Sequence, residues 1–119
     1  MKKILIFIFS VYTNSLISQD YYIYVAAESE DEVSLIKFDG TQAYEKEKIQ
    51  VGIMKTEIEG PHGITVDPNG EYWYLSLAHG NPYGSLVKYS TESNKPISKT
   101  KLGSMKYPLL AIIAAKFAI

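Results

Sequence analysis

The chain carries one strand-rich pattern twice, about fifty residues apart. Three pairs of segments match: 22–27 (YIYVAA) with 72–77 (YWYLSL), 34–39 (SLIKFD) with 85–90 (SLVKYS), and 51–52 (VG) with 102–103 (LG). In the first pair both Tyr-x-Tyr motifs fall on one face of the segment, as the period-2 alternation of a β-strand requires. Three matches at nearly one spacing indicate an internal repeat built from strands.

Turn signals separate the apolar runs of each copy. The clearest is Asp67-Pro68-Asn69-Gly70, where proline presets a turn and glycine tolerates positive φ. Strands are expected at 21–27, 33–39 and 44–51 in the first copy, which lacks an innermost strand, and at 62–67, 71–77, 84–90 and 95–102 in the second. A strand repeat of this length is typical of a β-propeller, whose blades are four-stranded sheets. We therefore expect an all-β fold, a fragment of a β-propeller with about two four-stranded antiparallel blades at about 20–52 and 60–103.

The repeat unit resembles the YVTN-type repeats of exported bacterial β-propellers. The resemblance rests on an apolar strand ending in Asp67-Pro68-Asn69-Gly70, an aromatic strand, the run Ser85-Leu86-Val87-Lys88-Tyr89, a polar turn and a closing Leu102-Gly103. It covers about residues 20 to 103 and implies a seven-bladed-type propeller, related to lactonase-like and cytochrome-associated groups and to the N-terminal domain of nitrous oxide reductase. In the last of these, histidines at one end of a propeller hold a copper cluster, and the likeness here extends to two histidines.

Both ends of the chain depart from the repeat. Residues 1–18 combine Lys2-Lys3 with a short apolar run and end in small residues, which predicts a signal peptide for export to the periplasm or beyond. The alternative is a membrane anchor, but the run is shorter than the roughly 20 apolar residues of a spanning helix, so no span is expected after cleavage. Residues 104–119 form an apolar tail without turn signals. We interpret it as the frameshifted end of a truncated propeller, or alternatively as a short helix or strand packed on the last blade.

Two blades leave apolar surface uncovered. Each is apolar on both faces, and repeat architectures usually need about three units for stability. We therefore expect the chain to be poorly soluble or to assemble with copies of itself through its exposed blade faces.

Composition excludes several classes of function. A formal net charge of −1 leaves no basic stripe for phosphates, so no nucleic-acid partner is expected. The chain contains no cysteine, which excludes disulfides, thiolate-bound zinc and thiol catalysis.

The candidate site residues gather at one end of the predicted blades, called the top. His62 lies at the start of one expected strand of the second copy and His79 follows the next, and the matching loop of the first copy, 28–32, holds Glu28 and Asp31. Imidazole and carboxylate together suit a divalent transition metal, copper or zinc, with His62 and His79 as the metal ligands. The same groups could supply a general base and an orienting acid. The alternative is that both histidines bond the backbone and that the acids form a solvated loop.

Two functional hypotheses follow from this pattern. The first is a non-catalytic scaffold of the cell envelope that presents its top loops to a protein or small-molecule ligand. The second is an enzyme, part of a metal-dependent oxidoreductase or a lactonase-like hydrolase, with His62 and His79 in its site. A third possibility is a truncated product without activity. No Gly-x-Ser-x-Gly or His-Glu-x-x-His motif is present, so no catalytic residue is assigned.

Overall fold

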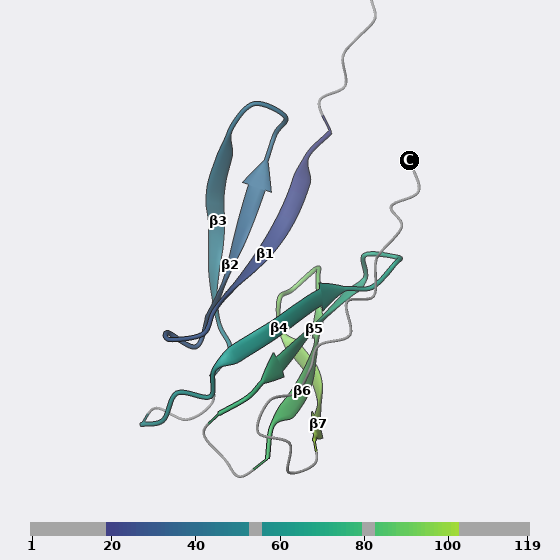
Figure 1. The fold of residues 1–119 in the computed structure, drawn as a ribbon. Coiled ribbons are helices and arrows are strands. Elements are labelled where there is room, and N and C mark those ends of the chain that lie inside the picture. Colours follow the sequence, from purple (N-terminus) through teal and green to yellow (C-terminus); the bar gives the residue numbers. More distant parts are fainter. Residues whose placement is uncertain (1–18, 53–55, 80–82, 103–119) are drawn as a thin grey trace, which may run out of the picture.

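The computed structural model describes residues 19–52, 56–79 and 83–102 (Figure 1), and this part of the chain is all β, without a helix. The strands are β1 (Tyr21–Ala27), β2 (Glu32–Phe38), β3 (Ala43–Gln50), β4 (Pro61–Val66), β5 (Tyr72–Leu77), β6 (Ser85–Ser90) and β7 (Pro96–Lys101). Each boundary lies within one residue of the predicted one. The predicted signal peptide and the apolar tail at 104–119 fall outside the described residues. Within the described ranges, no helix is long and apolar enough to cross a membrane.

The strands form two antiparallel sheets in simple sequence order. Sheet 1 has the order β1-β2-β3 and sheet 2 the order β4-β5-β6-β7. The second predicted blade therefore has its four strands, while the described part of the first has three, without the innermost one. Within each sheet every strand pairs antiparallel with the next strand in the sequence, which keeps the pairing local.

The two copies do not share one pairing register. In sheet 1, Val25 of β1 pairs with Ser34. The repeat matches these two residues to Leu75 and Ser85, but in sheet 2 Leu75 pairs with Val87, two residues after Ser85. The shorter β1–β2 turn accounts for this difference. A shift of two residues keeps every side chain on its original face, because the side-chain period of a strand is two.

The two sheets pack face to face. We call the side of each sheet that carries the Tyr-x-Tyr pair its tyrosine face (Tyr22 and Tyr24 in sheet 1, Tyr72 and Tyr74 in sheet 2) and the other side its back face. The tyrosine face of sheet 1 packs against the back face of sheet 2, with β1 beside β4 (Figure 1). The core residues are Val33, Leu35 and Ile49 of sheet 1, Val51 just after β3, and Trp73, Leu75, Leu77, Val87 and Tyr89 of sheet 2. Each such aliphatic side chain contributes about 1.5–3 kcal/mol on burial.

An aromatic stack forms the centre of the contact between the sheets. Trp73 is fully buried, with the Tyr24 ring of sheet 1 stacked at 4.9 Å on it and the Tyr89 ring at 3.9 Å. Asn94, in the turn between β6 and β7, completes the group, because its Oδ1 accepts hydrogen bonds from the Tyr24 hydroxyl at 2.9 Å and from Trp73 Nε1 at 3.2 Å. Its φ of 54° lies in the left-handed region, which asparagine tolerates. Asn94 Nδ2 also donates to Glu47 Oε2 of sheet 1 at 2.7 Å.

Burial of the Tyr24 hydroxyl predicts a loss of stability at alkaline pH. Burial and the nearby Glu47 raise the pKa of Tyr24 to about 12, above the value of about 10 for an unfolded tyrosine. The stability that Tyr24 contributes is therefore complete below about pH 10 and is lost as the pH rises towards 12. We expect Tyr24→Phe to lower the free energy of unfolding by about 0.5–1.5 kcal/mol at pH 8, because the hydrogen bond to Asn94 is lost.

The difference in the free energy of unfolding between wild type and Tyr24→Phe should become smaller as the pH rises from 10 to 12. Chemical denaturation in dilute solution measures it. The raised pKa values of Lys37 and Lys48 also cost stability in this range, but they act equally on both proteins. A difference that stays constant across this range would contradict the assignment to Tyr24.

Candidate metal centre

His62 lies in β4 at a β-bulge. Pro61 pairs with Leu77 and Gly63 with Ser76, so His62 is the extra residue on its strand. The Gly63 N–H donates to Ser76 Oγ at 3.0 Å and secures the bulge. Bulges re-aim side chains and are common beside functional sites. His62 accordingly projects from the sheet with 41% of its side chain exposed.

His79 follows β5 and is held through its backbone. The N–H groups of Ala78 and His79 donate to the carbonyls of Gly60 and Glu59, at 2.9 and 2.7 Å. Gly60 has a φ of +64°, and a Cβ added there would overlap the His79 ring. Glycine at position 60 therefore provides both the backbone turn before β4 and the space that the imidazole occupies.

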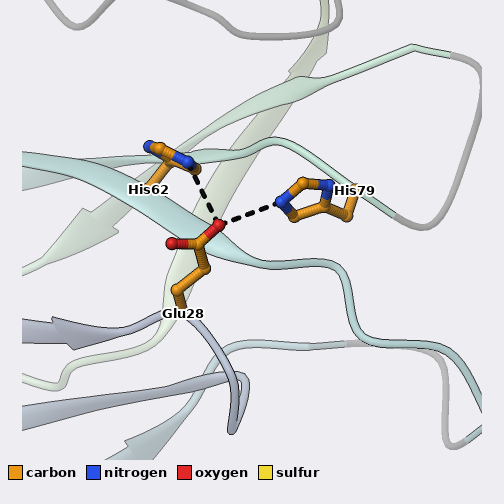
Figure 2. Close-up of side chains that lie close together, drawn as sticks. All are labelled: Glu28, His62 and His79. Atoms are coloured by element: carbon orange, nitrogen blue, oxygen red, sulfur yellow. Dashed lines mark hydrogen bonds and ion pairs between the residues drawn. The ribbon is translucent and has the colours of Figure 1, made fainter.

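Glu28 comes from the other sheet and lies between the two histidines. It opens the turn at 28–31 between β1 and β2, and its Oε1 lies 3.1 Å from His62 Nε2 and 3.0 Å from His79 Nε2 (Figure 2). The centroids of the two imidazole rings are 6.1 Å apart. The cluster of Glu28, His62 and His79 thus draws one residue from sheet 1 and two from sheet 2.

These contacts favour the ionised form of the Glu28 carboxyl. The hydrogen bond from His79 is the main cause that lowers the pKa of Glu28 below its ordinary value; burial opposes it, and the charges of the two imidazoles and the hydrogen bond from His62 each add a smaller effect. An ionised carboxylate only accepts hydrogen bonds, so each ring turns an Nε2–H towards it. A neutral imidazole can carry its proton on Nδ1 instead, which leaves the Nε2 lone pair for a metal ion.

Asp31, the fourth predicted site residue, does not join this cluster. Its side chain is buried, and its carboxylate oxygens accept hydrogen bonds from the backbone N–H groups of Glu59 at 2.9 Å and Gly60 at 2.8 Å. The carbonyls of Glu59 and Gly60 in turn accept hydrogen bonds from the backbone N–H groups of His79 and Ala78, respectively. Asp31 therefore fixes the position of the backbone that carries His79. Asp31 itself lies in the turn with a φ of 51°, a conformation that aspartate tolerates better than most residues.

The cluster has the donors and the spacing that a divalent metal ion requires. The three ligand atoms lie within 4.8 Å of one another. Two ligand atoms about 2.1 Å from a tetrahedral ion are roughly 3.4 Å apart. The two oxygen–nitrogen distances of 3.1 and 3.0 Å need little change, while the two imidazole nitrogens, which lie within 4.8 Å of each other, would have to come to this same separation. Two imidazoles and a carboxylate form a donor set that zinc uses in proteins, with the fourth position left for water or another ligand.

Open depressions lie on two sides of the cluster. One of about 480 Å³ is lined by Glu28, Ile58 and His79, among others. A second, of about 540 Å³, brings His79 together with Lys99 and Lys101. A ligand in either depression would reach His79. Glu59 also lines the second depression and pairs with Lys99 at 3.4 Å, so the charges there are mixed.

The buried role of Asp31 predicts a marked effect of Asp31→Asn on stability. The substituted amide keeps one acceptor but turns an NH₂ donor towards a backbone N–H, so we expect a loss of about 1–3 kcal/mol in the free energy of unfolding. Asp39→Asn is the matched control. The Asp39 carboxylate also accepts from two backbone N–H groups, those of Thr41 and Gln42, but at an exposed turn that asparagine also forms. Equal losses for the two variants in urea denaturation would refute the special role of Asp31.

A pair of glycine variants tests the contact between Gly60 and His79. Gly60 and Gly70 both have positive φ, but a Cβ at Gly70 meets nothing within 4 Å. Both substitutions to alanine carry a backbone cost of about 1–2 kcal/mol. Gly60→Ala should cost about 1–3 kcal/mol more, because the new methyl group displaces the imidazole. Histidine ring signals in NMR spectra should shift in Gly60→Ala and stay in place in Gly70→Ala; unshifted signals in both would argue against the contact.

No protein-family model, curated protein or solved structure matches this chain. The grounds for a function are therefore the fold of the described residues and the geometry of Glu28, His62 and His79.

Proposed function

We propose that this protein is a non-catalytic binding scaffold of the cell envelope that binds one zinc or copper ion through Glu28, His62 and His79. The bound ion, with its free coordination position, then serves to hold a small molecule or a side chain of a partner protein. The observation that carries the proposal is the meeting of two imidazole nitrogens at 3.1 and 3.0 Å from one carboxylate oxygen.

The contacts among Glu28, His62 and His79 contribute little to the stability of the fold. All three are exposed, with 53% of the Glu28 side chain accessible. Exposed ion pairs contribute about 0–1 kcal/mol, and ordering the side chains costs conformational entropy. A bound metal ion would hold all three side chains through coordination bonds, which an exposed ion pair alone does not supply.

The proposed location rests on the amino-terminal sequence pattern. Lys2-Lys3 followed by a short apolar run favours export. The ligand set suits that setting, because imidazole and carboxylate ligands do not oxidise to disulfides as thiolates do. Open depressions beside the cluster favour a scaffold over an enzyme, since enzymes generally enclose their substrates.

Metal titration tests the proposed site. We expect wild-type full-length protein to bind one equivalent of Zn²⁺ in isothermal titration calorimetry, and the same site to take Cu²⁺. His62→Ala, His79→Ala and Glu28→Gln should each weaken the affinity by at least about 10- to 100-fold, because each removes one of three ligands. Glu30→Gln is the matched control, an exposed acid on the same turn outside the cluster, and should leave the affinity unchanged. Equal affinities for all five proteins, or no binding by wild type, would reject the site.

The second candidate function, a metal-dependent hydrolase, is favoured by the three-ligand geometry. Catalytic zinc sites use three protein ligands and keep the fourth position for the reacting water. Hydrolysis of lactones or activated esters by the zinc-loaded protein, abolished by His79→Ala, would favour this alternative. Metal binding without turnover would favour the scaffold.

A further inference from the structure

The described part of the chain has four edge strands, β1 and β3 in sheet 1 and β4 and β7 in sheet 2. An edge strand presents a row of backbone N–H and C=O groups that can pair with a strand of another chain. Proteins usually prevent such pairing with charged residues, with proline or with a β-bulge at the edge. The four edges can therefore be compared by these features.

Three of the four edges carry them. β3 has an unbroken run of charged residues at 45–48, and its pairing with β2 shifts register at a bulge. β4 begins with Pro61 and has a bulge next to it. β7 begins with Pro96 and contains two lysines, and its pairing with β6 also shifts register. None of these three strands offers a regular, uncharged edge.

The edge at β1 carries none of these features. Its sequence, YYIYVAA, contains no charged residue and no proline, and all seven residues pair with β2 without a register shift. Tyr21, Tyr22, Ile23 and Val25 are 47–52% exposed and belong to both faces of the strand. Exposed groups of large apolar side chains mark interaction surfaces in soluble proteins. β1 is therefore a regular, apolar edge that is open to pairing.

The second copy of the repeat shows what kind of strand belongs at this edge. β1 matches β5 in the sequence repeat, and β5 pairs with β4 on the side that does not face β6. β4 places Ile64 and Val66 on the back face, packed against the core, and Gly63 and Thr65 on the tyrosine face. The strand in this position thus alternates β-branched apolar residues with small ones.

We propose that the free edge of β1 binds an extended segment of a partner protein, which adds to sheet 1 as a fourth strand antiparallel to β1. The segment is uncharged and alternates as β4 does, with β-branched apolar side chains beside Ile23 and Val25 on the back face and small side chains on the tyrosine face. In strand addition the backbone hydrogen bonds supply affinity and the alternate side chains supply specificity. This contact does not involve the proposed metal ion.

Sheet 2 limits the side chains that the segment can carry on the tyrosine face. β1 lies beside β4, and the Tyr24 ring of β1 is stacked on Trp73. Large side chains of an added strand on this face would therefore meet sheet 2, whereas small ones fit. The β1 strand of a second copy carries Tyr22 and Tyr24 on this face, so pairing between two β1 strands is disfavoured.

A peptide that copies β4 tests this edge. The probe is a fluorescently labelled synthetic peptide with the sequence of residues 60–66, GPHGITV, added to dilute full-length protein. EDTA in the buffer removes metal ions, so the result is independent of the proposed metal site. Fluorescence anisotropy should show saturable binding, and a peptide with the same residues in scrambled order should bind at least about 10-fold more weakly.

A pair of lysine variants tests the location. Ile23→Lys places a charge at the β1 edge and should weaken peptide binding by about 10-fold. Ile97→Lys is the matched control, because it places the same charge on an equally exposed isoleucine of β7, and it should leave the binding unchanged. Equal binding by the two variants, or no binding by wild type, would overturn the proposal.

Two N-methylated peptides distinguish strand addition from binding through side chains alone. Alternate N–H groups of a strand point towards its neighbour, and the others point away. One peptide is methylated on the nitrogens corresponding to Gly63 and Thr65, and the other on those corresponding to Ile64 and Val66. One of the two should retain binding and the other should lose it, whereas equal affinities would contradict strand addition.

Two further measurements complete the test. Light scattering of the protein without peptide should give the mass of one chain. A mass of two chains that Ile23→Lys reduces to one would show that β1 pairs with a second copy, which overturns the assignment to a partner segment. Near-ultraviolet circular dichroism of the buried Trp73 reports whether Ile23→Lys retains the packing between the sheets. If it does not, Val25→Lys places the same charge on the same edge, with the same expected loss of peptide binding.

Discussion

The rest of the structure depends on the hydrogen bonds of the Asp31 carboxylate to the backbone N–H groups of Glu59 and Gly60, at 2.9 and 2.8 Å. They join the β1–β2 turn of sheet 1 to Glu59 and Gly60, the two residues that precede β4 of sheet 2. Buried backbone N–H groups without an acceptor are costly, so this turn and these two residues cannot separate without losing both bonds. Glu28 lies in the same turn as Asp31, and the backbone N–H of His79 donates to the carbonyl of Glu59. One contact therefore fixes both the relative position of the sheets and the shape of the site.

The strands could be predicted from the sequence because their signals are local. Alternation in 72–77 and the Asp67-Pro68-Asn69-Gly70 turn depend on neighbours a few residues apart, and the observed β5 follows them closely. The pairing register could not be predicted in the same way. Ser34 and Ser85 match in the sequence, but the pairing of β5 with β6 is shifted by two residues relative to the pairing of β1 with β2. The different lengths of the two turns cause this shift.

The site was predictable only in outline. Strand direction places His62, His79 and the 28–32 turn at one end, but composition cannot distinguish Glu28, which faces the histidines, from Asp31, which turns inward to the backbone. That distinction depends on the positive φ of Asp31 and on a β-bulge at His62, neither of which has a sequence signal beyond residue type. The role of Asn94 could not be predicted either. In the sequence it is one residue of a polar turn, whereas in the structure it accepts hydrogen bonds from Tyr24 of sheet 1 and Trp73 of sheet 2.

The site follows from the asymmetric way in which the two copies of the repeat meet. Each sheet meets the next by opposite sides, so the turn of one copy comes to lie beside the strand ends of the following copy, and Glu28 reaches His62 and His79. The cluster is therefore a feature of the junction between the two sheets of one chain, and it exists only because consecutive copies of the repeat meet in this order.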